Sequence, residues 1–264
     1  LEVLYSFTPR IEAASVDEAY LDLTGATHFY PTLEKLGSEI QRKIYENVQL
    51  TASVGIASNK FLAKLGSEWE KPEGLKIIDD SEVEALLKPL SIEKIWGVGP
   101  KFAKKLKGYG FYTIGQLQKA NIMQLISLFG PQGEVLYELA WGRDSRPVEH
   151  REAPKSMGHE ETFSKDLSVL ELKTALARLT AKVGTRLRKG GYFASTVTLK
   201  ARFSNFETIT RSKTLATPTQ DDDLLFATAQ ELLCNLSQKH KYRLIGITAS
   251  NLTTYRQPSL FVSS

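Results

Sequence analysis

The sequence predicts an α+β protein of several domains, and three observations support this fold class. Residues 1–78 alternate short β-type runs with amphipathic helical runs, which is typical of α/β structure around a small sheet. Residues 79–146 contain short helical segments separated by glycine- and proline-containing turns. Residues 155–252 follow the order β-α-β-β-α-β, which predicts four strands and two helices. Residues 147–154 are polar and begin and end with proline, as expected of a linker.

The first region is organised around residues 15–24, which read Ser-Val-Asp-Glu-Ala-Tyr-Leu-Asp-Leu-Thr. Apolar runs on either side predict two short strands with an acidic turn between them. Adjacent side chains of a straight strand point to opposite faces, so Asp17 and Glu18 can converge only where the backbone bends. Two converging carboxylates suit Mg²⁺, which takes oxygen ligands and fills its remaining positions with water and substrate phosphates. A solvated acidic turn is the alternative.

A strand that leads into a helix follows. Residues 50–56 form a β-type run, residues 60–70 have helical periodicity, and residues 75–78 predict a further short strand. A basic side chain in the first turns of such a helix can reach a phosphate near the positive end of the helix dipole. Lys64 and Lys60 are therefore candidate phosphate ligands, with ordinary surface lysines as the alternative.

Polar residues predict where the helices of the first half begin. Ser58 or Asn59 is a suitable N-cap for the helix just described, and a helix is expected over residues 32–46 with its apolar side chains on one side. Residues 79–81 read Asp-Asp-Ser and predict the N-cap of a helix over residues 82–87, which Pro89 stops.

A glycine-rich turn lies between two predicted helices at residues 95–100, which read Ile-Trp-Gly-Val-Gly-Pro. The small residues allow the backbone amides of Gly97, Val98 and Gly99 to approach a phosphate, and the helix that follows over 101–109 adds its dipole. That helix also carries a cluster of lysines, namely Lys101, Lys104, Lys105 and Lys107. A dinucleotide-binding loop is the competing interpretation, but it requires a third glycine and a preceding strand.

Basic charge is concentrated in the last region. Residues 155–264 contain sixteen Lys and Arg against nine Asp and Glu, a net charge of +7, which leaves −3 for residues 1–154 out of the +4 of the whole chain. We expect this region to bind a nucleic-acid backbone without reading its sequence. A merely solvated sheet face is the alternative. The candidate residues lie on what we expect to be the two central strands: Lys200, Arg202, Arg211 and Lys213, with hydroxyls at Ser195, Thr196, Thr198, Ser204, Thr208, Thr210 and Ser212.

Composition excludes several other classes of protein. The chain has 264 residues, of which 42% are hydrophobic and 24% charged, so it is long enough for two or three domains, and no apolar run approaches membrane-spanning length. The single cysteine, Cys234, excludes an intramolecular disulfide, and its apolar helical neighbours predict a buried thiol. The acidic run at 221–223 is interpreted as an N-cap and first helical turn. The histidines have no metal-ligand spacing: His28, His150, His159 and His240.

These blocks together resemble the Y-family DNA polymerases, which copy damaged DNA. The acidic turn resembles the second catalytic motif of the family, and residues 51–65 with the Lys-Pro-Glu-Gly that follows resemble its nucleotide-binding block. The resemblance covers nearly the whole chain. It implies a partial palm over residues 1–78, a helical helix-hairpin-helix thumb over 79–146, a linker over 147–154 and a little-finger domain over 155–252, whose four-stranded sheet is antiparallel.

The resemblance also implies roles for the site residues. In the complete enzyme, Asp17 and Glu18 would supply part of a site for two Mg²⁺ ions that transfers a nucleotide to the primer 3′-hydroxyl. Lys64 would contact the triphosphate of the incoming deoxynucleotide, with Lys60 a weaker candidate. Primer-template DNA would lie against the hairpin and the last domain. The first metal-binding motif, the steric-gate aromatic and the fingers of the family are not found in the sequence, and Asp22 is no substitute. We therefore expect a fragment that is inactive alone.

The C-terminal tail, residues 253–264, offers apolar anchors on a polar segment. Gln257 followed by Leu260 and Phe261 resembles the peptide by which bacterial proteins bind the sliding clamp. The expected protein is thus a bacterial, cytoplasmic monomer without a membrane partner. Two other functions stay open. The chain could be a non-catalytic module that binds DNA and the clamp, or a helix-hairpin-helix nuclease, although the latter lacks a further acidic cluster or general-base histidine.

Overall fold

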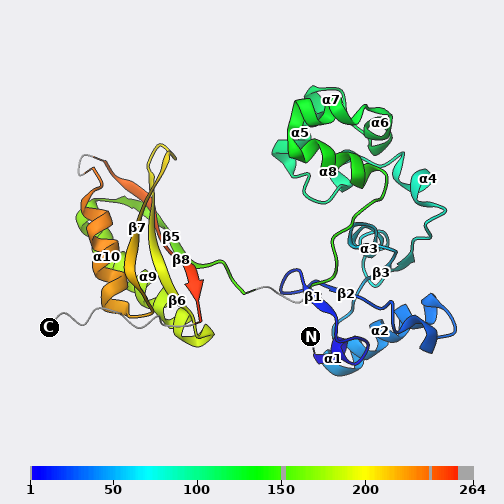
Figure 1. Cartoon of the computed structure of the whole chain (residues 1–264), viewed down its shortest axis with the longest axis horizontal. Helices are drawn as coiled ribbons and strands as arrows, with labels where there is room; N and C mark the ends of the chain where they lie inside the picture. Colours follow the sequence, from blue (N-terminus) through cyan, green and yellow to red (C-terminus); the bar gives the residue numbers. More distant parts are fainter. Residues whose placement is uncertain (1, 150–152, 238–239, 255–264) are drawn as a thin grey trace. The chain divides into compact units, whose positions relative to one another are not determined.

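The structure, a computed structural model, describes residues 2–149, 153–237 and 240–254. The chain forms two compact units, Leu1–Glu152 and Ala153–Ser264 (Figure 1). We call them the N-terminal unit and the C-terminal unit and describe each by itself. No helix among the described residues combines the length and the apolar character that crossing a membrane requires.

Four short strands of the N-terminal unit are arranged in two pairs. β1 (Ile11–Ala13) and β2 (Ala19–Leu21) form an antiparallel hairpin around the acidic turn, as predicted. β3 (Val54–Ile56) and β4 (Leu75–Ile77) are parallel, and the chain between them contains a helix, as a parallel pair requires. The expectation of one small sheet is wrong for the described residues, because the two pairs make separate two-stranded sheets.

The helices that accompany these strands are α1 (Glu2–Tyr5), α2 (Leu33–Val48) and α3 (Lys60–Ser67), with a 3-10 turn η1 (Thr27–Phe29). The hydroxyl of Thr32 caps α2 by accepting a hydrogen bond from a backbone N–H. Of the two candidate N-caps for α3, Asn59 is the one used, because its side chain accepts a hydrogen bond from the backbone N–H of Leu62.

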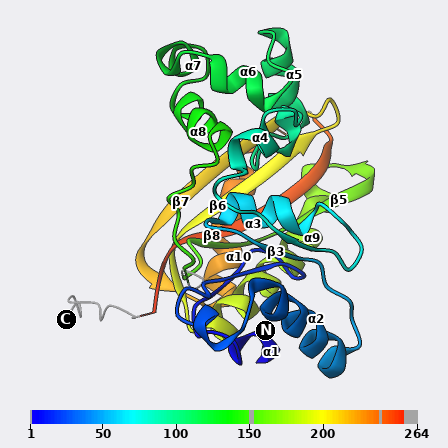
Figure 2. The same ribbon diagram turned by 90° about the vertical axis from the view of Figure 1, so that its right-hand side faces the viewer.

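The helical part of the N-terminal unit consists of α4 (Val83–Leu87), η2 (Ile92–Lys94), α5 (Pro100–Gly108), α6 (Ile114–Lys119), α7 (Ile122–Phe129) and α8 (Pro131–Ala140) (Figure 2). Its buried cluster includes Leu87, Leu106, Ile114 and Leu125. Phe61, on the buried face of α3, belongs to the same cluster. Helix α3 therefore joins the strand-bearing part to the helical part through a shared core.

One predicted helix start is wrong. A carboxylate oxygen of Asp79 accepts hydrogen bonds from the backbone N–H and the hydroxyl of Ser81, which makes a local turn. Helix α4 begins later, after Glu82, and no side chain caps it. The Asp79 side chain is thus used in a local turn with Ser81 and is not available to cap the helix.

The C-terminal unit has the predicted order β-α-β-β-α-β: β5 (Ser156–Leu167), α9 (Val169–Gly190), β6 (Phe193–Phe203), β7 (Thr208–Thr219), α10 (Asp222–Cys234) and β8 (Tyr242–Thr253). The four strands form one antiparallel sheet in the order β5-β8-β6-β7. Helix α9 packs against β5 and β8, and α10 packs against β6 and β7 (Figure 1). The helices therefore cover one face of the sheet, which we call the helix face, and the other is the open face.

Two predictions about the C-terminal unit are wrong. The central strands are β6 and β8, whereas β7 lies at an edge of the sheet. Cys234 is exposed because it is the last residue of α10, whose buried face is formed by neighbours such as Leu232 and Leu233. The acidic run behaves as predicted, since Asp221 caps α10 by accepting a hydrogen bond from the backbone N–H of Leu224 at 2.9 Å.

Candidate catalytic and DNA-binding sites

The acidic turn closes the β1-β2 hairpin. The backbone N–H groups of Ala14 and Ser15 both donate to the carbonyl oxygen of Glu18, which bends the chain as the sequence required. The hydroxyl of Ser15 lies 2.5 Å from Oδ1 of Asp17. This hydrogen bond holds the pKa of the exposed Asp17 carboxyl below its ordinary value. Asp17 therefore presents a carboxylate to solvent and keeps its charge in mild acid.

Lys64 lies against the acidic turn. Its Nζ is 2.5 Å from Oε1 of Glu18 and 3.0 Å from Oε1 of Glu68, the C-cap residue of the same helix. Burial lowers the pKa of Lys64, but the hydrogen bonds to the two carboxylates outweigh burial and raise it above its ordinary value. The structure thus brings the candidate triphosphate ligand to a candidate metal ligand. The sequence analysis did not single out Glu68, and its only signal was the spacing of four residues from Lys64.

Lys60 has a different environment. Its Nζ lies 2.8 and 2.6 Å from the two carboxylate oxygens of Glu12 on β1, and 3.2 Å from the carbonyl oxygen of Pro147. It also lies 5.2 Å from the ring centroid of Tyr20. Although burial raises the pKa of Glu12, hydrogen bonds from Lys60 and from the backbone N–H of Glu149 hold it below its ordinary value. The two lysines of α3 therefore have separate partners, and Lys60 ties structural elements together.

The segment after α8 packs on the N-terminal unit. The carboxylate of Asp144, only 2% exposed, accepts a hydrogen bond at 3.1 Å from the backbone N–H of Phe61 and pairs with both Nε and Nη2 of Arg146 at 2.7 Å. The Arg146 guanidinium lies 4.3 Å from the ring centroid of Trp96 in the glycine-rich turn. Residues 143–149 thus connect α3 to that turn. The sequence analysis missed this network, because a polar segment with prolines has no periodicity that would indicate packing.

The glycine-rich turn lies beside α3. A groove of about 440 Å³ is lined by Lys64 of α3 and its C-cap residue Glu68 on one side and by residues 93–99 on the other. Gly97 has a φ of +88°, a conformation that favours glycine, whereas Gly99 has an ordinary φ of −78° and serves as the N-cap of α5. A Cβ atom at either position would meet nothing within 4 Å. The backbone is therefore accessible at Gly97 and Gly99. The prediction for Val98 is wrong, because Val98 is buried and its backbone N–H already donates to the carbonyl oxygen of Ile95 at 3.0 Å.

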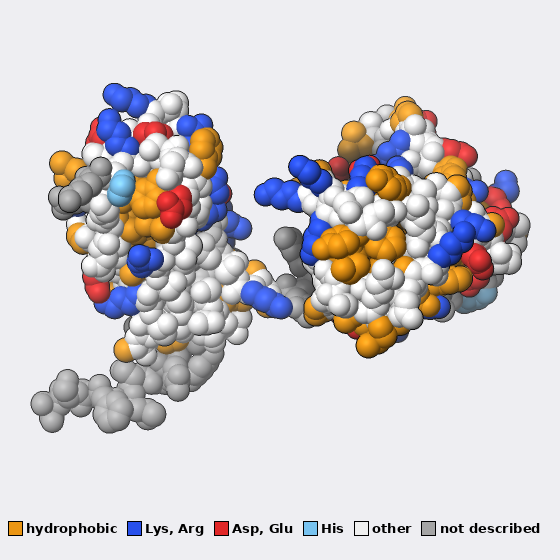
Figure 3. Space-filling view, turned by 90° about the horizontal axis from the view of Figure 1, so that it is seen from above, with side chains coloured by type: hydrophobic (Ala, Val, Ile, Leu, Met, Phe, Trp, Pro, Cys, Tyr) orange, Lys and Arg blue, Asp and Glu red, His pale blue; other side chains and the backbone are white. Residues whose placement is uncertain are grey.

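The lysines of α5 are not equivalent. Lys107 pairs with Glu93 at 2.7 Å, and Lys105 donates to the carbonyl oxygen of Leu128 at 3.3 Å. Lys101 and Lys104 are exposed and have no ion-pair partner within the described residues. In the space-filling view, basic side chains lie at separate places on each unit, with hydrophobic side chains exposed between them (Figure 3). Lys101 and Lys104 are thus the cations of this helix that remain available to a phosphate.

The four candidate cations of the C-terminal unit lie on two faces of its sheet. Register pairs Lys200 and Arg202 of β6 with Thr210 and Thr208 of β7, and these four point to the open face. The hydroxyl pair Thr198–Ser212 (2.9 Å) lies in the next row of that face. Arg211 and Lys213 pair with the buried Leu199 and Val197, which places them on the side of the helices, and Lys213 contacts Glu231 of α10 at 2.5 Å. The expected single basic surface is therefore wrong.

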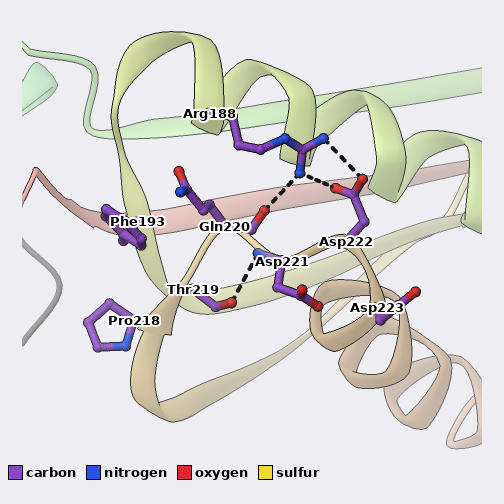
Figure 4. A pocket seen from close by; sticks show the side chains of 8 residues that line it. All are labelled: Arg188, Phe193, Pro218, Thr219, Gln220, Asp221, Asp222 and Asp223. Atoms are coloured by element: carbon purple, nitrogen blue, oxygen red, sulfur yellow. Dashed lines mark hydrogen bonds and ion pairs between the residues drawn. The ribbon is translucent and has the colours of Figure 1, made fainter. Parts of the chain in front are cut away.

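A hollow at the start of α10 contains the acidic run (Figure 4). The guanidinium of Arg188 on α9 pairs with both carboxylate oxygens of Asp222, at 2.8 and 3.0 Å, and donates to the carbonyl oxygen of Gln220. Asp221 is the N-cap already described. The Asp222 carboxylate therefore joins α10 to α9, and the Asp221 carboxylate caps α10.

Comparison with known proteins identifies the family. Residues 1–68 match the impB/mucB/samB family, residues 80–111 match the helix-hairpin-helix motif of the same family, and residues 154–260 match its C-terminal domain. DNA polymerase IV of Desulfatibacillum aliphaticivorans is 38% identical over 265 residues, which cover 98% of this chain and 67% of that protein. DNA polymerase IV of Streptococcus mutans is 38% identical over 253 residues, 95% of this chain and 68% of that protein.

A solved Y-family DNA polymerase chimera of Dbh and Dpo4 has the same architecture, with a TM-score of 0.84 and 27% identity over 95% of this chain and 73% of that one. The fold is thus that of the translesion repair polymerase family, with a helix-hairpin-helix thumb and a little finger that contains a four-stranded antiparallel sheet. The chain belongs to the Y family of DNA polymerases, in its DinB-type DNA polymerase IV branch. It spans about two thirds of the length of the relatives named above.

Proposed function

We propose that this chain supplies nucleotide-binding and DNA-binding parts of a polymerase that copies damaged templates by two-metal nucleotidyl transfer. One observation carries the proposal: Nζ of Lys64 is held at Glu18 of the acidic turn, beside a groove that the hairpin of the thumb also lines. A cation for the triphosphate, a carboxylate for a metal and an accessible backbone turn for DNA thus adjoin one another.

The acidic turn fits part of a magnesium site. DNA polymerase IV enzymes use divalent metal ions, and Asp17 and Glu18 supply the hard carboxylate oxygens that Mg²⁺ prefers. Among the residues that the structure describes, no group of three or more His, Cys, Asp or Glu could hold a metal ion. We propose that the turn supplies two ligands of a larger set. When bound, Mg²⁺ would neutralise charge on the phosphates and lower the pKa of the primer 3′-hydroxyl.

The residues of this chain would prepare the nucleotide site. Hydrogen bonding by Ser15 keeps Asp17 ionised. If Glu18 turned from Lys64 to a metal ion, Glu68 would still hold the ammonium of Lys64 in place. Lys64 could then donate to a triphosphate oxygen, whereas Lys60, bound by Glu12 and Pro147, would keep its structural role.

Primer-template DNA would bind at two places. In the thumb, the amides of Gly97 and Gly99 with Lys101 and Lys104 would contact backbone phosphates. In the little finger, Lys200 and Arg202 with their neighbouring hydroxyls would do the same. Neither place offers a pattern of side chains that reads bases, so binding would be independent of sequence. In both places the cations face solvent, which makes the binding sensitive to salt.

Three further expectations concern the whole protein. The predicted clamp-binding residues Gln257, Leu260 and Phe261 lie outside the described residues, and binding of a bacterial sliding clamp through them remains our proposal. We also propose that the protein is monomeric and cytoplasmic. A pull-down with the clamp, using Phe261→Ala as the control, tests the first of these directly.

A second candidate function is a non-catalytic module that binds DNA and the clamp. The observation that favours it is the small number of potential metal ligands beside the acidic turn among the described residues. It predicts DNA binding without nucleotide transfer, even when further metal ligands are available.

The deciding experiment is primer extension with Mg²⁺ and four deoxynucleoside triphosphates, together with DNA binding across a salt series. It uses this chain and a fusion to the part of the Streptococcus mutans relative that it does not match. We expect salt-sensitive DNA binding by both proteins and extension by the fusion, abolished by Asp17→Ala. DNA binding without extension by the fusion would favour the non-catalytic module. Failure of the chain to bind DNA at low salt would overturn both functions.

A further inference from the structure

An ion pair crosses the centre of the open face of the little finger. Nζ of Lys200 on β6 lies 2.7 Å from Oε2 of Glu160 on β5. These strands are not neighbours, because β8 lies between them. Register aligns Glu160 with Gly246 and Gly246 with Lys200, so the two side chains meet above a residue that has no side chain.

The glycine at this crossing is required by space. A Cβ atom at position 246 would lie only 2.8 Å from Cβ of Glu160. Gly158 of β5 is restricted in the same way, because a Cβ atom there would lie 2.7 Å from Oγ1 of Thr248. Thr248 pairs in register with Thr198 of β6. The middle of the open face is therefore low, with Gly246 buried beneath the ion pair and the Lys200 ammonium and threonine hydroxyls around it.

The carboxylate of Glu160 occupies the position that an anionic ligand of Lys200 would take. Carboxylate and phosphate oxygens accept the same charge-assisted hydrogen bond from an ammonium group. The side chains of Lys200 and Glu160 are 33% and 53% exposed, so the pair can separate without any change in the sheet. Exposed ion pairs of this kind are weak, and a ligand can replace one partner.

We propose that Lys200, with Thr198 and Thr248, forms a DNA phosphate subsite, and that Glu160 is a built-in anion that competes with the phosphate for it. This proposal rests on the proposed function, because it assumes that the open face contacts DNA. Glu160 then lowers the affinity of the little finger for DNA, and each binding event exchanges the Glu160 carboxylate for a backbone phosphate at Lys200.

The adjacent residue provides a matched control. Glu161 carries the same charge, but its carboxylate pairs with Arg178 of α9 at 2.6 Å, on the helix face. Glu160→Gln and Glu161→Gln change the net charge equally and differ only in the face of the sheet on which the charge is lost.

The test measures binding of labelled primer-template DNA to the full chain by fluorescence anisotropy across a KCl series. We expect Glu160→Gln to tighten binding about threefold to tenfold near 0.1 M salt, and Glu161→Gln to change it by less than about twofold. In a Lys200→Gln background, Glu160→Gln should give no gain. Thermal unfolding of each variant serves as the check on folding.

Two results would overturn the proposal. An equal gain from Glu160→Gln and Glu161→Gln would mean that only net charge matters, and a gain from Glu160→Gln that persists without Lys200 would mean that the subsite is not there. If the wild-type chain binds no DNA at low salt, the proposed function itself fails. If the wild-type chain binds DNA but Glu160→Gln has no effect, the proposed function stands and only this inference fails.

Discussion

The ammonium of Lys64 and the carboxylate of Glu18 are 2.5 Å apart, although 46 residues separate them in the sequence. The candidate ligand of the triphosphate is thus held by a candidate ligand of the metal. The hydrogen bond from Lys64 to Glu18 helps to raise the pKa of the Lys64 ammonium, and this pair would separate when a nucleotide arrives with its metal ion, while Glu68 keeps Lys64 in place.

This relationship predicts that Lys64→Ala weakens binding of a deoxynucleoside triphosphate with Mg²⁺ by about tenfold or more, since a hydrogen bond to a charged group contributes about 1.5–3 kcal/mol. Isothermal titration calorimetry measures the affinity. Lys35→Ala, which removes an exposed lysine of α2, is the control and should have no effect. An affinity of Lys64→Ala within twofold of the wild type would remove Lys64 from the nucleotide site.

Asp144 should stabilise the N-terminal unit in a manner that depends on pH. Burial raises the pKa of Asp144, but hydrogen bonds from Arg146 and from the backbone N–H of Phe61 outweigh it and hold the pKa below the ordinary 3.8. A carboxyl group with a lowered folded pKa contributes stability above its unfolded pKa, and this contribution is lost as the pH falls through the folded value. Asp144→Asn should therefore cost about 1–3 kcal/mol at pH 7.

Urea unfolding followed by tryptophan fluorescence measures this cost, because all three tryptophans belong to the N-terminal unit. The difference between wild type and Asp144→Asn should be constant from pH 7 to pH 5 and should shrink below about pH 3.8. Asp80→Asn, at an exposed position, is the control. A difference that stays the same in acid would show that the ion pair with Arg146 is not its source.

The two glycines of the thumb hairpin should respond differently to substitution by alanine. Gly97→Ala forces a side chain into the left-handed region and should destabilise the unit by about 1–2 kcal/mol. Gly99→Ala has an ordinary backbone and open space around it, so it should cost less than about 1 kcal/mol. Its added methyl group would nevertheless hinder a phosphate.

We therefore expect Gly99→Ala to lower DNA affinity several-fold while leaving the unfolding midpoint almost unchanged. Gly108→Ala is the control, since it lies at the other end of α5, also with open space around it. Fluorescence anisotropy and urea unfolding give the two quantities. DNA affinity that is the same for Gly99→Ala and Gly108→Ala would contradict a role of the hairpin backbone in phosphate binding.

The separation of the basic residues of the little finger predicts unequal effects on DNA binding. Lys200→Gln and Arg202→Gln should each weaken binding and reduce the slope of log affinity against log salt concentration by about 0.9, the value for one phosphate contact. Arg211→Gln and Lys213→Gln should leave that slope unchanged, because both residues lie on the helix side of the sheet. Equal slopes for all four variants would show that DNA reaches both faces.

The elements built from neighbouring residues could be predicted from the sequence. The hairpin around Asp17, the caps at Asn59 and Asp221 and the order of elements in the little finger depend on contacts over a few residues. The prediction failed where the same residues are compatible with two local structures. Residues 79–81 could cap a helix or form a turn, and they form a turn.

The placement of Lys200 and Lys213 could not be predicted in the same way. The alternation of side chains along a strand predicts which residues of that strand share a face. It does not predict which residues of the neighbouring strand lie on that same face of the sheet. That choice depends on the register of β6 with β7 and on the side that α9 and α10 cover.

The sequence by itself determined the family, the acidic turn, the candidate lysines and the hairpin of the thumb, because each is a short pattern whose chemistry is local. Only the tertiary structure decided that Lys64 meets Glu18, that Lys60 meets Glu12 and that Asp144 holds the backbone of Phe61 from 83 residues away. These contacts depend on how the helices and strands pack around a shared core. Because many residues contribute to the free energy of that packing, the contacts cannot be predicted from any single segment of the sequence.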